Sequence, residues 1–485
     1  MDAEEIPMTT TSRKPPAAND SDSQFRVAAA APGADRYAVY SPRLGLRPSG
    51  VPPLQEYVAV IGEERMERVL QAARALRDRR IVELNATATG GGVAEMLFSS
   101  VPFMNLLGVE TEWRVIPGNE SFFECTKGLH NLLQGKRGEF TREMERTYCT
   151  TMADIVRHDM VRSEDDIVIV NDPQPLGLAR HLKKDGQSWL WRCHIDIENG
   201  RSNGQTDLWN FMESWIHAYD AAIFSAMYYV VTGWRVPSYV IPPFIDPLSE
   251  KNRSLTGKEI ETVTDRYGID TGVPIIAQIG RFDPWKGIDR TIETFRQVRK
   301  EVACQLIIAG GIAGDDPEGN RILEDIREKT KPDKDVHLLK LSLDDRMQNW
   351  LEVNALQRAA DIVMQPSTRE GFGLVITEAL WKGKPVIGSD VGGIPLQIHD
   401  GENGLYFDTP QKTAKRIVHL LKNPASAAAM GRKAHEAVKE RFLLPDRVGD
   451  YLAAIGMTLD CRRSTRTNGS ITSFYPWYRI CKGSK

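Results

Sequence analysis

The sequence predicts an α/β protein built from two domains that face each other across a cleft. Short apolar strands alternate with helical stretches along most of the 485 residues. Strands that are apolar on both faces are typical of parallel sheets covered by helices on both sides. A chain of this length, of which 41 % is hydrophobic, can bury two or three cores. Each domain is therefore expected to be Rossmann-like, with a Pro-dense linker at 241–247 between them.

The expected elements begin after an N-terminal tail. Residues 1–50 are rich in Ala, Pro, Ser, Thr and Asp and lack apolar periodicity, which predicts disorder. A helical pattern over 55–80 follows, and the strands are then expected at 81–85, 166–170, 189–191, 275–279, 305–309, 361–364 and 385–388. The predicted domain boundaries are 51–243 and 244–450, followed by a tail at 451–485 whose structure the sequence leaves open.

Charge and hydropathy argue against two classes of partner. Lys and Arg number 62 against 65 Asp and Glu, so the formal net charge of −3 gives no basic excess for nucleic acid. The longest apolar run, 221–231, is about half of the roughly 20 residues that a membrane-spanning helix needs. The N-terminus lacks the basic and apolar regions of a secretory signal, which favours the cytoplasm. The basic, aromatic stretch 461–485 is interpreted as a poorly ordered terminus, with docking to a membrane surface or a partner as the alternative.

Two motifs that follow strands could hold an anion. Three glycines at 90–92 lie between a strand and a helix start, where unpaired N–H groups and the helix dipole favour negative charge. Such a turn can equally be only a tight connection. Arg281 and Lys286 follow the strand at 275–279, where a planar guanidinium and a compact ammonium can converge on a diphosphate. Solvated surface charges are the alternative, although the proline and glycine of this segment indicate a shaped loop.

Two glutamates eight residues apart, Glu370 and Glu378, give the sharpest signal. A helix beginning near Phe372 would place Glu370 in the loop at its positive end and Glu378 about two turns further along. The pair could then address a sugar ring and a ribose of one ligand. Isolated glutamates are by default solvated helix charges, but the flanking glycines of Gly-Phe-Gly and a downstream Gly-Gly pair favour a ligand loop.

These motifs together resemble a retaining family 4 glycosyltransferase of the GT-B fold. Arg-x4-Lys after a strand and Glu-x7-Glu with Gly-Phe-Gly carry the likeness. Five further stretches, in the same order, are similar to trehalose synthases, which join nucleotide-activated glucose to free glucose. These stretches are 90–95, 171–175, 194–196, 281–287 and 315–319, within a likeness that runs from about Gln55 to Tyr451. Compact members of this family end in a helix that packs back onto the first domain, whereas the tail after Cys461 departs from their pattern.

The resemblance implies a role for each matched residue. The donor would be bound by Gly91, Gly92, Arg281, Lys286, Glu370, Gly371, Phe372, Gly373, Leu374 and Glu378. Among these, the cations and glycines would hold the diphosphate, Glu370 the glucose and Glu378 the ribose. The residues implied in catalysis are Arg281, Lys286, Glu370 and His194, with a satisfied core histidine as the alternative for His194. The acceptor glucose is expected in the first domain, at Glu95, Asp172, Gln174 and Asp196.

The expected reaction is a reversible, front-face transfer of glucose from ADP-, UDP- or GDP-glucose to glucose, with retention of the α configuration to give α,α-trehalose. Positive groups around the leaving diphosphate would supply the main stabilisation. We expect no metal site and no tightly bound cofactor, with Mg²⁺ entering only with the free nucleotide. Small sugars and the nucleotide-sugar are the expected partners, and a homodimer is among the allowed assemblies. A trehalose phosphorylase and a non-catalytic GT-B scaffold remain as alternatives.

Overall fold

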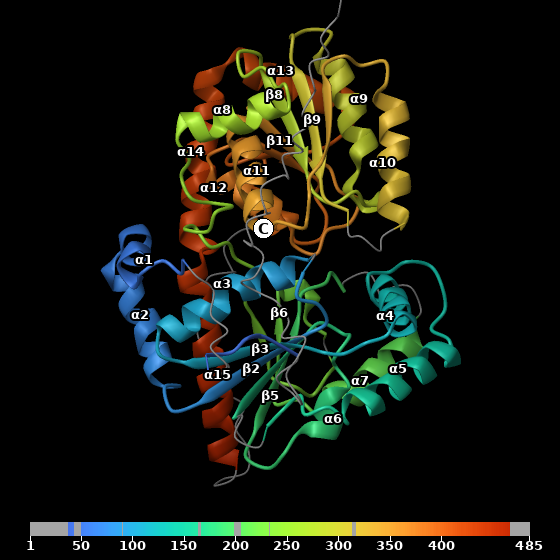
Figure 1. Ribbon diagram of the computed structural model, residues 1–485, viewed down its shortest axis with the longest axis vertical. Coiled ribbons are helices and arrows are strands. Elements are labelled where there is room, and N and C mark those ends of the chain that lie inside the picture. The colour runs from blue at the N-terminus through green and yellow to red at the C-terminus, as the bar shows by residue number, and fades with distance from the viewer. Residues whose placement is uncertain are drawn as a thin grey trace, which may run out of the picture.

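Two parallel sheets, each covered by helices, form the two halves of the molecule (Figure 1). The computed structural model describes residues 37–42, 50–89, 91–162, 166–197, 205–231, 233–312 and 317–465. The first sheet has the strand order β1-β3-β2-β4-β5-β6-β7, and the second has the order β10-β9-β8-β11-β12-β13. The structure thus confirms the predicted α/β architecture of two domains.

The sheet of the first domain has helices on both faces. Its strands are β1 (Ala38–Tyr40), β2 (Arg80–Asn85), β3 (Glu110–Val115), β4 (Ile167–Asn171), β5 (Ser188–Cys193), β6 (Ala221–Phe224) and β7 (Ser238–Val240). Strands β2 to β7 all run parallel to one another, whereas β1 pairs with β3 in the antiparallel direction. Successive side chains of a strand point to opposite faces. Ile81 therefore packs into one core and its neighbour Val82 into another.

Four helices cover each face of this sheet. The face of Ile81 carries α1 (Leu54–Ile61), α2 (Glu63–Arg74), α3 (Gly92–Leu106) and α15 (Leu444–Thr465). The face of Val82 carries α4 (Glu120–Leu133), α5 (Arg142–Ile155), α6 (Leu178–Leu182) and α7 (Thr206–Ile216). In the part of the chain that the structure describes, none of the helices combines the length and the apolar character needed to cross a membrane.

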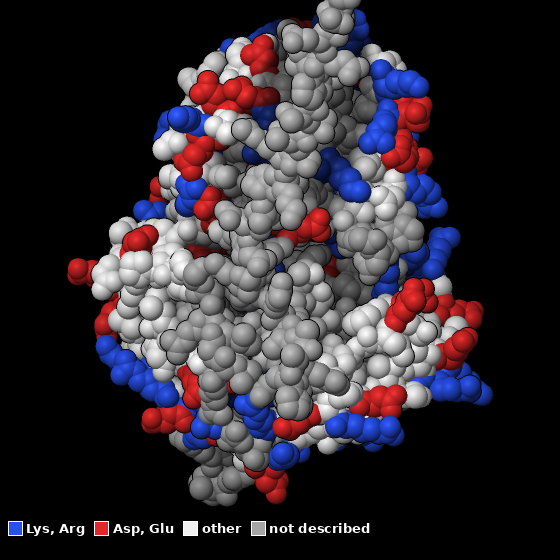
Figure 2. All heavy atoms as spheres, in the orientation of Figure 1, with Lys and Arg blue, Asp and Glu red and all other residues white. Residues whose placement is uncertain are grey.

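The second domain repeats this plan with a wholly parallel sheet. Its strands are β8 (Ile275–Ile279), β9 (Gln305–Gly310), β10 (Val336–Lys340), β11 (Ile362–Gln365), β12 (Val386–Gly388) and β13 (Leu405–Tyr406). Its helices are α8 (Gly257–Arg266), α9 (Ile288–Val298), α10 (Pro317–Thr330), α11 (Arg346–Ala359), α12 (Leu374–Trp381), α13 (Pro410–Lys422) and α14 (Pro424–Arg441). Over α9 and α10, Figure 2 shows acidic and basic side chains interspersed, and ion pairs such as Lys329–Asp289 lie there.

The chain crosses between the domains twice, and the two crossings are bonded to each other. Ile245 lies in the Pro-dense segment that leads out of the first domain, and its N–H donates to the carbonyl of Phe442 at 2.9 Å. The N–H of Leu444, where α15 begins, donates back to the carbonyl of Ile245 at 2.9 Å. From there α15 runs down the side of the first domain (Figure 1), where Arg65 of α2 donates to Asp446 at 2.6 Å.

The structure corrects the expectations for both ends of the chain. The first 50 residues were predicted to be disordered, but β1 lies among them, because Ala38, Val39 and Tyr40 are buried and pair with β3. Residues 451–465 belong to α15, which packs against α2 and α3. Residues 1–36, 43–49 and 466–485 lie outside the described residues, as do Gly90 and residues 315–316 of the family-like stretches.

Two glycines of α15 allow a matched test of its packing. A Cβ on Gly449 would lie 3.0 Å from Cγ2 of Val69, whereas a Cβ on Gly456 meets no described atom within 4 Å. Replacing either glycine with leucine raises helix propensity by about 1 kcal/mol. We expect Gly456→Leu to leave the Tm unchanged or raise it, and Gly449→Leu to lower stability by about 1–3 kcal/mol through overpacking. Thermal unfolding of both variants checks this, and equal Tm values would contradict the close packing.

Candidate functional site

The residues expected to bind ligands follow strands of both sheets. Gly91 follows β2, Asp172 follows β4 and His194 follows β5 in the first domain. In the second domain, Arg281 follows β8 and Glu370 follows β11. Loops at the carboxyl ends of parallel strands meet at one edge of a sheet, which is where open α/β sheets bind their ligands. The site is therefore assembled from the facing edges of the two sheets.

An ion pair between Lys286 and Glu370 lies at the centre of the second domain's edge. The Nζ of Lys286 donates to Oε2 of Glu370 at 2.6 Å, and Ser367 Oγ donates to the same oxygen at 3.2 Å. Gly287 turns the chain after Lys286 with a φ of 64°, and a Cβ there would lie 2.1 Å from the carbonyl oxygen of Pro366. Only glycine allows the two loops to approach this closely. The two predicted residues are thus brought together by their backbones.

Arg281 lies near this pair but points more into solvent. Its side chain is 60 % exposed, and its guanidinium is 3.7 Å from Asp283. Arg281 and Lys286 line the same small cavity, together with Gly280 and Gln365. Burial and the charge of Arg281 lower the pKa of His130, on α4 of the first domain, to about 4. His130 therefore stays neutral beside Arg281 and adds no second positive charge there.

The backbone of the loop that carries Glu370 packs against a pair of glycines, Gly392 and Gly393. Gly392 has a φ of 53°, and a Cβ there would lie 1.8 Å from the carbonyl oxygen of Glu370. The N–H of Gly393 donates to that carbonyl at 3.1 Å. Gly373 starts α12 with a φ of 85°, which turns the loop into the helix. The Gly-Gly pair that favoured a ligand loop in the sequence therefore acts as a support for the loop.

The first domain contacts this loop through residues that the sequence did not single out. The hydroxyl of Tyr229 donates to the carbonyl of Gly371 at 3.0 Å, and that of Tyr228 to the carbonyl of Gly392 at 2.7 Å. Arg369 reaches in the opposite direction, and its guanidinium donates to the carbonyls of Gln134 and Gly135 beyond α4. Each contact joins a side chain to a carbonyl of the other domain, so no residue-type pattern within one domain could reveal it.

The glycine-rich loop meets the start of α12. Gly91 caps α3 and Gly92 is its first residue, and a Cβ on Gly92 would lie 3.3 Å from Cδ1 of Leu374. One expected donor residue, Phe372, lies differently. The ring of Phe372 is 4 % exposed and packs against Phe442 with ring centroids 5.6 Å apart, so it belongs to the core.

Glu378 and Glu95, expected to bind the ribose and the acceptor, share one lysine. The carboxylate of Glu378 is fully buried and lies 2.8 Å from Lys251 Nζ, which also donates to both oxygens of Glu95 at 2.9 Å. Burial opposes the ionisation of Glu378, but the charges of Lys251 and Lys382 outweigh it and lower the pKa of this carboxyl. The structure thus joins these two predicted residues, from opposite domains, through Lys251.

His194 is held in one orientation by a buried network. Asn171 Nδ2 donates to Glu83 Oε2 at 2.8 Å and to the Leu84 carbonyl at 3.2 Å, so its oxygen faces His194 Nε2 at 2.9 Å. The hydrogen of the neutral ring must then be on Nε2. Burial and the charge of Arg192 lower the pKa of His194 well below its usual value, which keeps the ring neutral. Its Nδ1 is buried and has no hydrogen-bond partner among the described residues.

This network ends on the last helix. The hydroxyl of Tyr451, on α15, donates to Glu83 Oε1 at 2.8 Å. Glu83, Arg192, His194 and Tyr451 line one small cavity. The orientation of His194 therefore depends on the helix that returns from the second domain. A satisfied core histidine would have both ring nitrogens bonded, which is not the arrangement of His194 in the described part of the chain.

The other expected acceptor residues surround His194. Asp172 Oδ1 accepts from the N–H of His194 at 2.8 Å, and Asp172 has a φ of 64°. The backbone N–H of Asp196 lies close to Gly371, where a Cβ would be 3.6 Å away. Gln174 Oε1 is buried without a hydrogen-bond partner among the described residues. The structure thus groups Asp172, His194 and Asp196 beside the loop of Glu370, and Glu95 stands apart on α3.

Asp172 generates a prediction about pH. Burial raises the pKa of Asp172 to about 7 from 3.8, so the folded state resists its ionisation and this group's contribution to stability falls as the pH rises from about 4 to 7. Asn accepts the same hydrogen bond and tolerates positive φ. We expect Asp172→Asn to match the wild type near pH 4 and to exceed its unfolding free energy by about 4 kcal/mol at pH 8. Urea unfolding at both pH values measures this, and a constant difference would contradict it.

Comparison with known proteins places this geometry in a family. A family model described as trehalose synthase, N-terminal domain, matches residues 83–231, and a model of glycosyl transferases group 1 matches residues 259–437. A trehalose synthase from Pyrococcus horikoshii is 41 % identical over 407 residues, which is 83 % of this chain and 96 % of that relative. A trehalose phosphorylase from Grifola frondosa is 29 % identical over 416 residues, which is 76 % of this chain and 55 % of that relative.

A solved structure bears on the fold. The α,α-trehalose 6-phosphate synthase from Burkholderia multivorans has a TM-score of 0.60 at 14 % identity, over 80 % of this chain and all of that one (100 %). The two-sheet architecture is accordingly GT-B. Because the identity to the Pyrococcus horikoshii protein extends over nearly all of that protein, both domains of this chain share its family. This chain belongs to the trehalose synthase family of GT-B glycosyltransferases, and it is a hexosyltransferase.

Proposed function

We propose that the enzyme transfers glucose from a nucleotide-glucose to free glucose and forms α,α-trehalose reversibly, with retention at the anomeric carbon. The observation that carries the proposal is the 2.6 Å pair of Lys286 and Glu370, held by backbone contacts opposite the glycine-rich loop and His194. A fixed cation and a fixed carboxylate, side by side, suit a ligand with phosphate at one end and sugar hydroxyls at the other.

The donor diphosphate would lie between Arg281, Lys286 and the amides at Gly91–Gly92. Arg281 is exposed and free to close on the phosphate, whereas Lys286 is already positioned by Glu370. Fixed positive groups stabilise the charge that develops on the leaving diphosphate and need no reorganisation when it forms. Glu370 would bind hydroxyls of the glucose. The carboxylate of Glu378 is fully buried and paired with Lys251. A ribose hydroxyl bound by Glu378 would therefore share this carboxylate with the lysine.

Transfer would take place on one face of the sugar. The bond from C1 to the diphosphate oxygen breaks as the bond from C1 to the acceptor oxygen forms, and the proton of the acceptor hydroxyl passes to the leaving phosphate. A double-displacement glycosidase instead needs two carboxyl groups about 5 Å apart across the scissile bond. Glu370 is engaged by Lys286, and Glu378 is buried beneath Lys251, so neither is placed as that nucleophile.

The acceptor glucose would bind in the first domain near His194. The neutral ring offers Nδ1 as an acceptor for a sugar hydroxyl, and Gln174 offers a side-chain oxygen without a described partner. Asp172 and Asp196 line the same segment. We propose that the enzyme uses no tightly bound cofactor or metal ion of its own, meets Mg²⁺ only with free nucleotide, and acts on small molecules in the cytoplasm.

A product assay separates this proposal from a phosphorylase. Purified protein is incubated with glucose and each of ADP-, UDP- and GDP-glucose, and in parallel with glucose 1-phosphate and glucose. We expect α,α-trehalose, identified by the NMR signal of its paired anomeric protons, with at least one nucleotide-glucose. Product from glucose 1-phosphate alone, with none from any nucleotide-glucose, would instead assign a phosphorylase.

The ion pair of Lys286 gives the sharpest mutational test. We expect Lys286→Met to lower kcat/KM for the nucleotide-glucose by about 10²-fold or more, because a preorganised positive group is lost from the leaving group. Lys412→Met is the matched control, because it removes a lysine that pairs with Asp408 at 2.9 Å on the surface, where the lysine side chain is 69 % exposed. Steady-state kinetics of both variants decide the point, and unaltered kcat/KM for Lys286→Met would remove the central support of the proposal.

A further inference from the structure

We propose that Lys251 is a positioning residue of the donor site. Its ammonium group joins Glu95 of the first domain to Glu378 of the second, and so fixes the glycine-rich loop against the start of α12. The inference rests on the proposed function for the ligand that this loop would cover. The ion cluster of Lys251, Glu95 and Glu378 itself stands on the geometry of the described residues.

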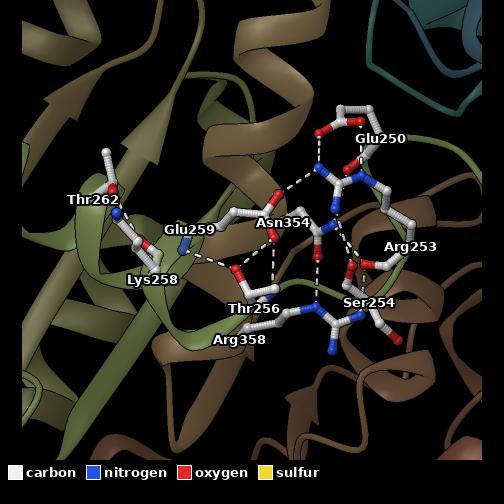
Figure 3. Close-up of polar contacts among 9 residues, drawn as sticks. All are labelled: Glu250, Arg253, Ser254, Thr256, Lys258, Glu259, Thr262, Asn354 and Arg358. Carbon is white, nitrogen blue, oxygen red and sulfur yellow. Dashed lines mark hydrogen bonds and ion pairs between the residues drawn. The ribbon is translucent and has the colours of Figure 1, made fainter.

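The backbone on both sides of Lys251 is fastened to α11. Asn354 Nδ2 donates to the carbonyls of Glu250 at 2.8 Å and Arg253 at 2.9 Å. Arg358, one turn further along α11, donates to the carbonyl of Arg253 at 2.9 Å. Figure 3 shows Asn354 and Arg358 pointing from the helix toward this segment, with Arg253 folded back onto Glu250 and onto Glu259 at the start of α8. The segment is thus fixed in position.

A second set of contacts fastens the same segment to α12. The carbonyl of Asn252 accepts from Trp381 Nε1 at 3.2 Å, and its side-chain oxygen accepts from Lys382 Nζ at 3.1 Å. Trp381 ends the helix on which Glu378 lies. Lys251 is therefore carried by a backbone that moves with α12 as one unit. Its side chain starts from a fixed point and ends 2.8 Å from a fixed carboxylate.

The other carboxylate belongs to the first domain. Glu95 lies in the first turn of α3, and its N–H donates to the carbonyl of Gly91 at 3.1 Å. Gly91, Gly92 and Glu95 therefore move together. Since Gly92 also meets Leu374, the ion cluster and this apolar contact fix the same two helix starts relative to each other. Both oxygens of Glu95 are bonded to Lys251, which assigns Glu95 to this bridge rather than to the acceptor glucose.

The contact between Glu95 and Glu378 across the domains depends on the positive charge of Lys251. Side-chain exposure is 13 % for Lys251, 26 % for Glu95 and 0 % for Glu378. Two carboxylates this close and this buried repel each other and lose their hydration, which is tolerable only with a paired cation. Without Lys251 the two helix starts would separate, and the glycine amides would no longer meet the diphosphate. The loss should therefore appear in donor binding rather than in glucose binding.

Charge reversal tests the bridge. Lys251→Glu places three carboxylates together, and Glu95→Lys places two cations against Glu378. The double variant restores the balance of one cation and two carboxylates, with the cation and one carboxylate exchanged across the domain interface. We expect each single variant to raise the KM for the nucleotide-glucose at least tenfold, with a smaller change in the KM for glucose, and the double variant to return to within about threefold of the wild type. Glu95→Gln, a milder change that removes the charge of Glu95 and one of its two accepting oxygens, should raise the donor KM in the same direction.

Controls separate bridging from folding. Glu352→Gln breaks the 2.7 Å pair with Arg266 inside the second domain. We expect it to lower the Tm without changing the donor KM. A double variant as impaired as the single variants, or single variants that change the Tm but leave the donor KM unaltered, would overturn the proposal.

The test also distinguishes this inference from the proposed function. If the wild type turned over no nucleotide-glucose, the proposed function would fail by itself. Small-angle X-ray scattering without ligand would still test the bridge. We expect a larger radius of gyration for the single variants than for the wild type and the double variant, and equal radii for all four would overturn the bridge.

Discussion

Buried charge between the two domains has to be paired, and this requirement shapes the whole interface. Lys251 meets this requirement by pairing with both Glu95 and Glu378, and Lys286 meets it by pairing with Glu370. Each pair is placed by backbone contacts that glycine alone permits or that side chains of α11 and α12 enforce. Electrostatic groups held in this way keep their positions in the absence of ligand, which is what a preorganised transfer site requires.

The last helix ties this site to the fold. α15 starts beside Ile245, contacts α2 through Asp446 and reaches Glu83 through Tyr451. One apolar core continues from the first domain through α15 into the second. The orientation of His194 therefore depends on residues from both ends of the described chain. Folding of α15 is thereby coupled to the assembly of the site in this chain.

The sequence predicted most of the fold because buried parallel strands are apolar on both faces. β4, β8, β9 and β11 appear in it as short runs of Ile and Val. β3 was missed because it carries Glu112 and Arg114, which look solvent-exposed in a sequence but are buried as a pair at 2.5 Å. β1 was missed because three residues within a stretch rich in Ala and Pro give no periodicity.

Within the candidate site, the sequence predicted the residues that follow strands, such as Lys286 and Glu370, since strand ends and glycines mark them locally. Lys251, Tyr229 and Tyr451 gave no such signal, because their partners are remote in the chain. Their contacts exist only after both domains have folded and met.

The paired crossings at Ile245 and Phe442 define how the domains can separate. Two backbone segments that are hydrogen-bonded side by side form a hinge between the domains. Rotation about this hinge is the relative motion of the domains that costs the least free energy. In Figure 1 this hinge lies on the side of α14 and α15, opposite α4. The hydrogen bonds of Arg369 to the carbonyls of Gln134 and Gly135 beyond α4 therefore lie across the molecule from this hinge. An angular opening about this hinge would break these hydrogen bonds and part the two domains on the side of α4.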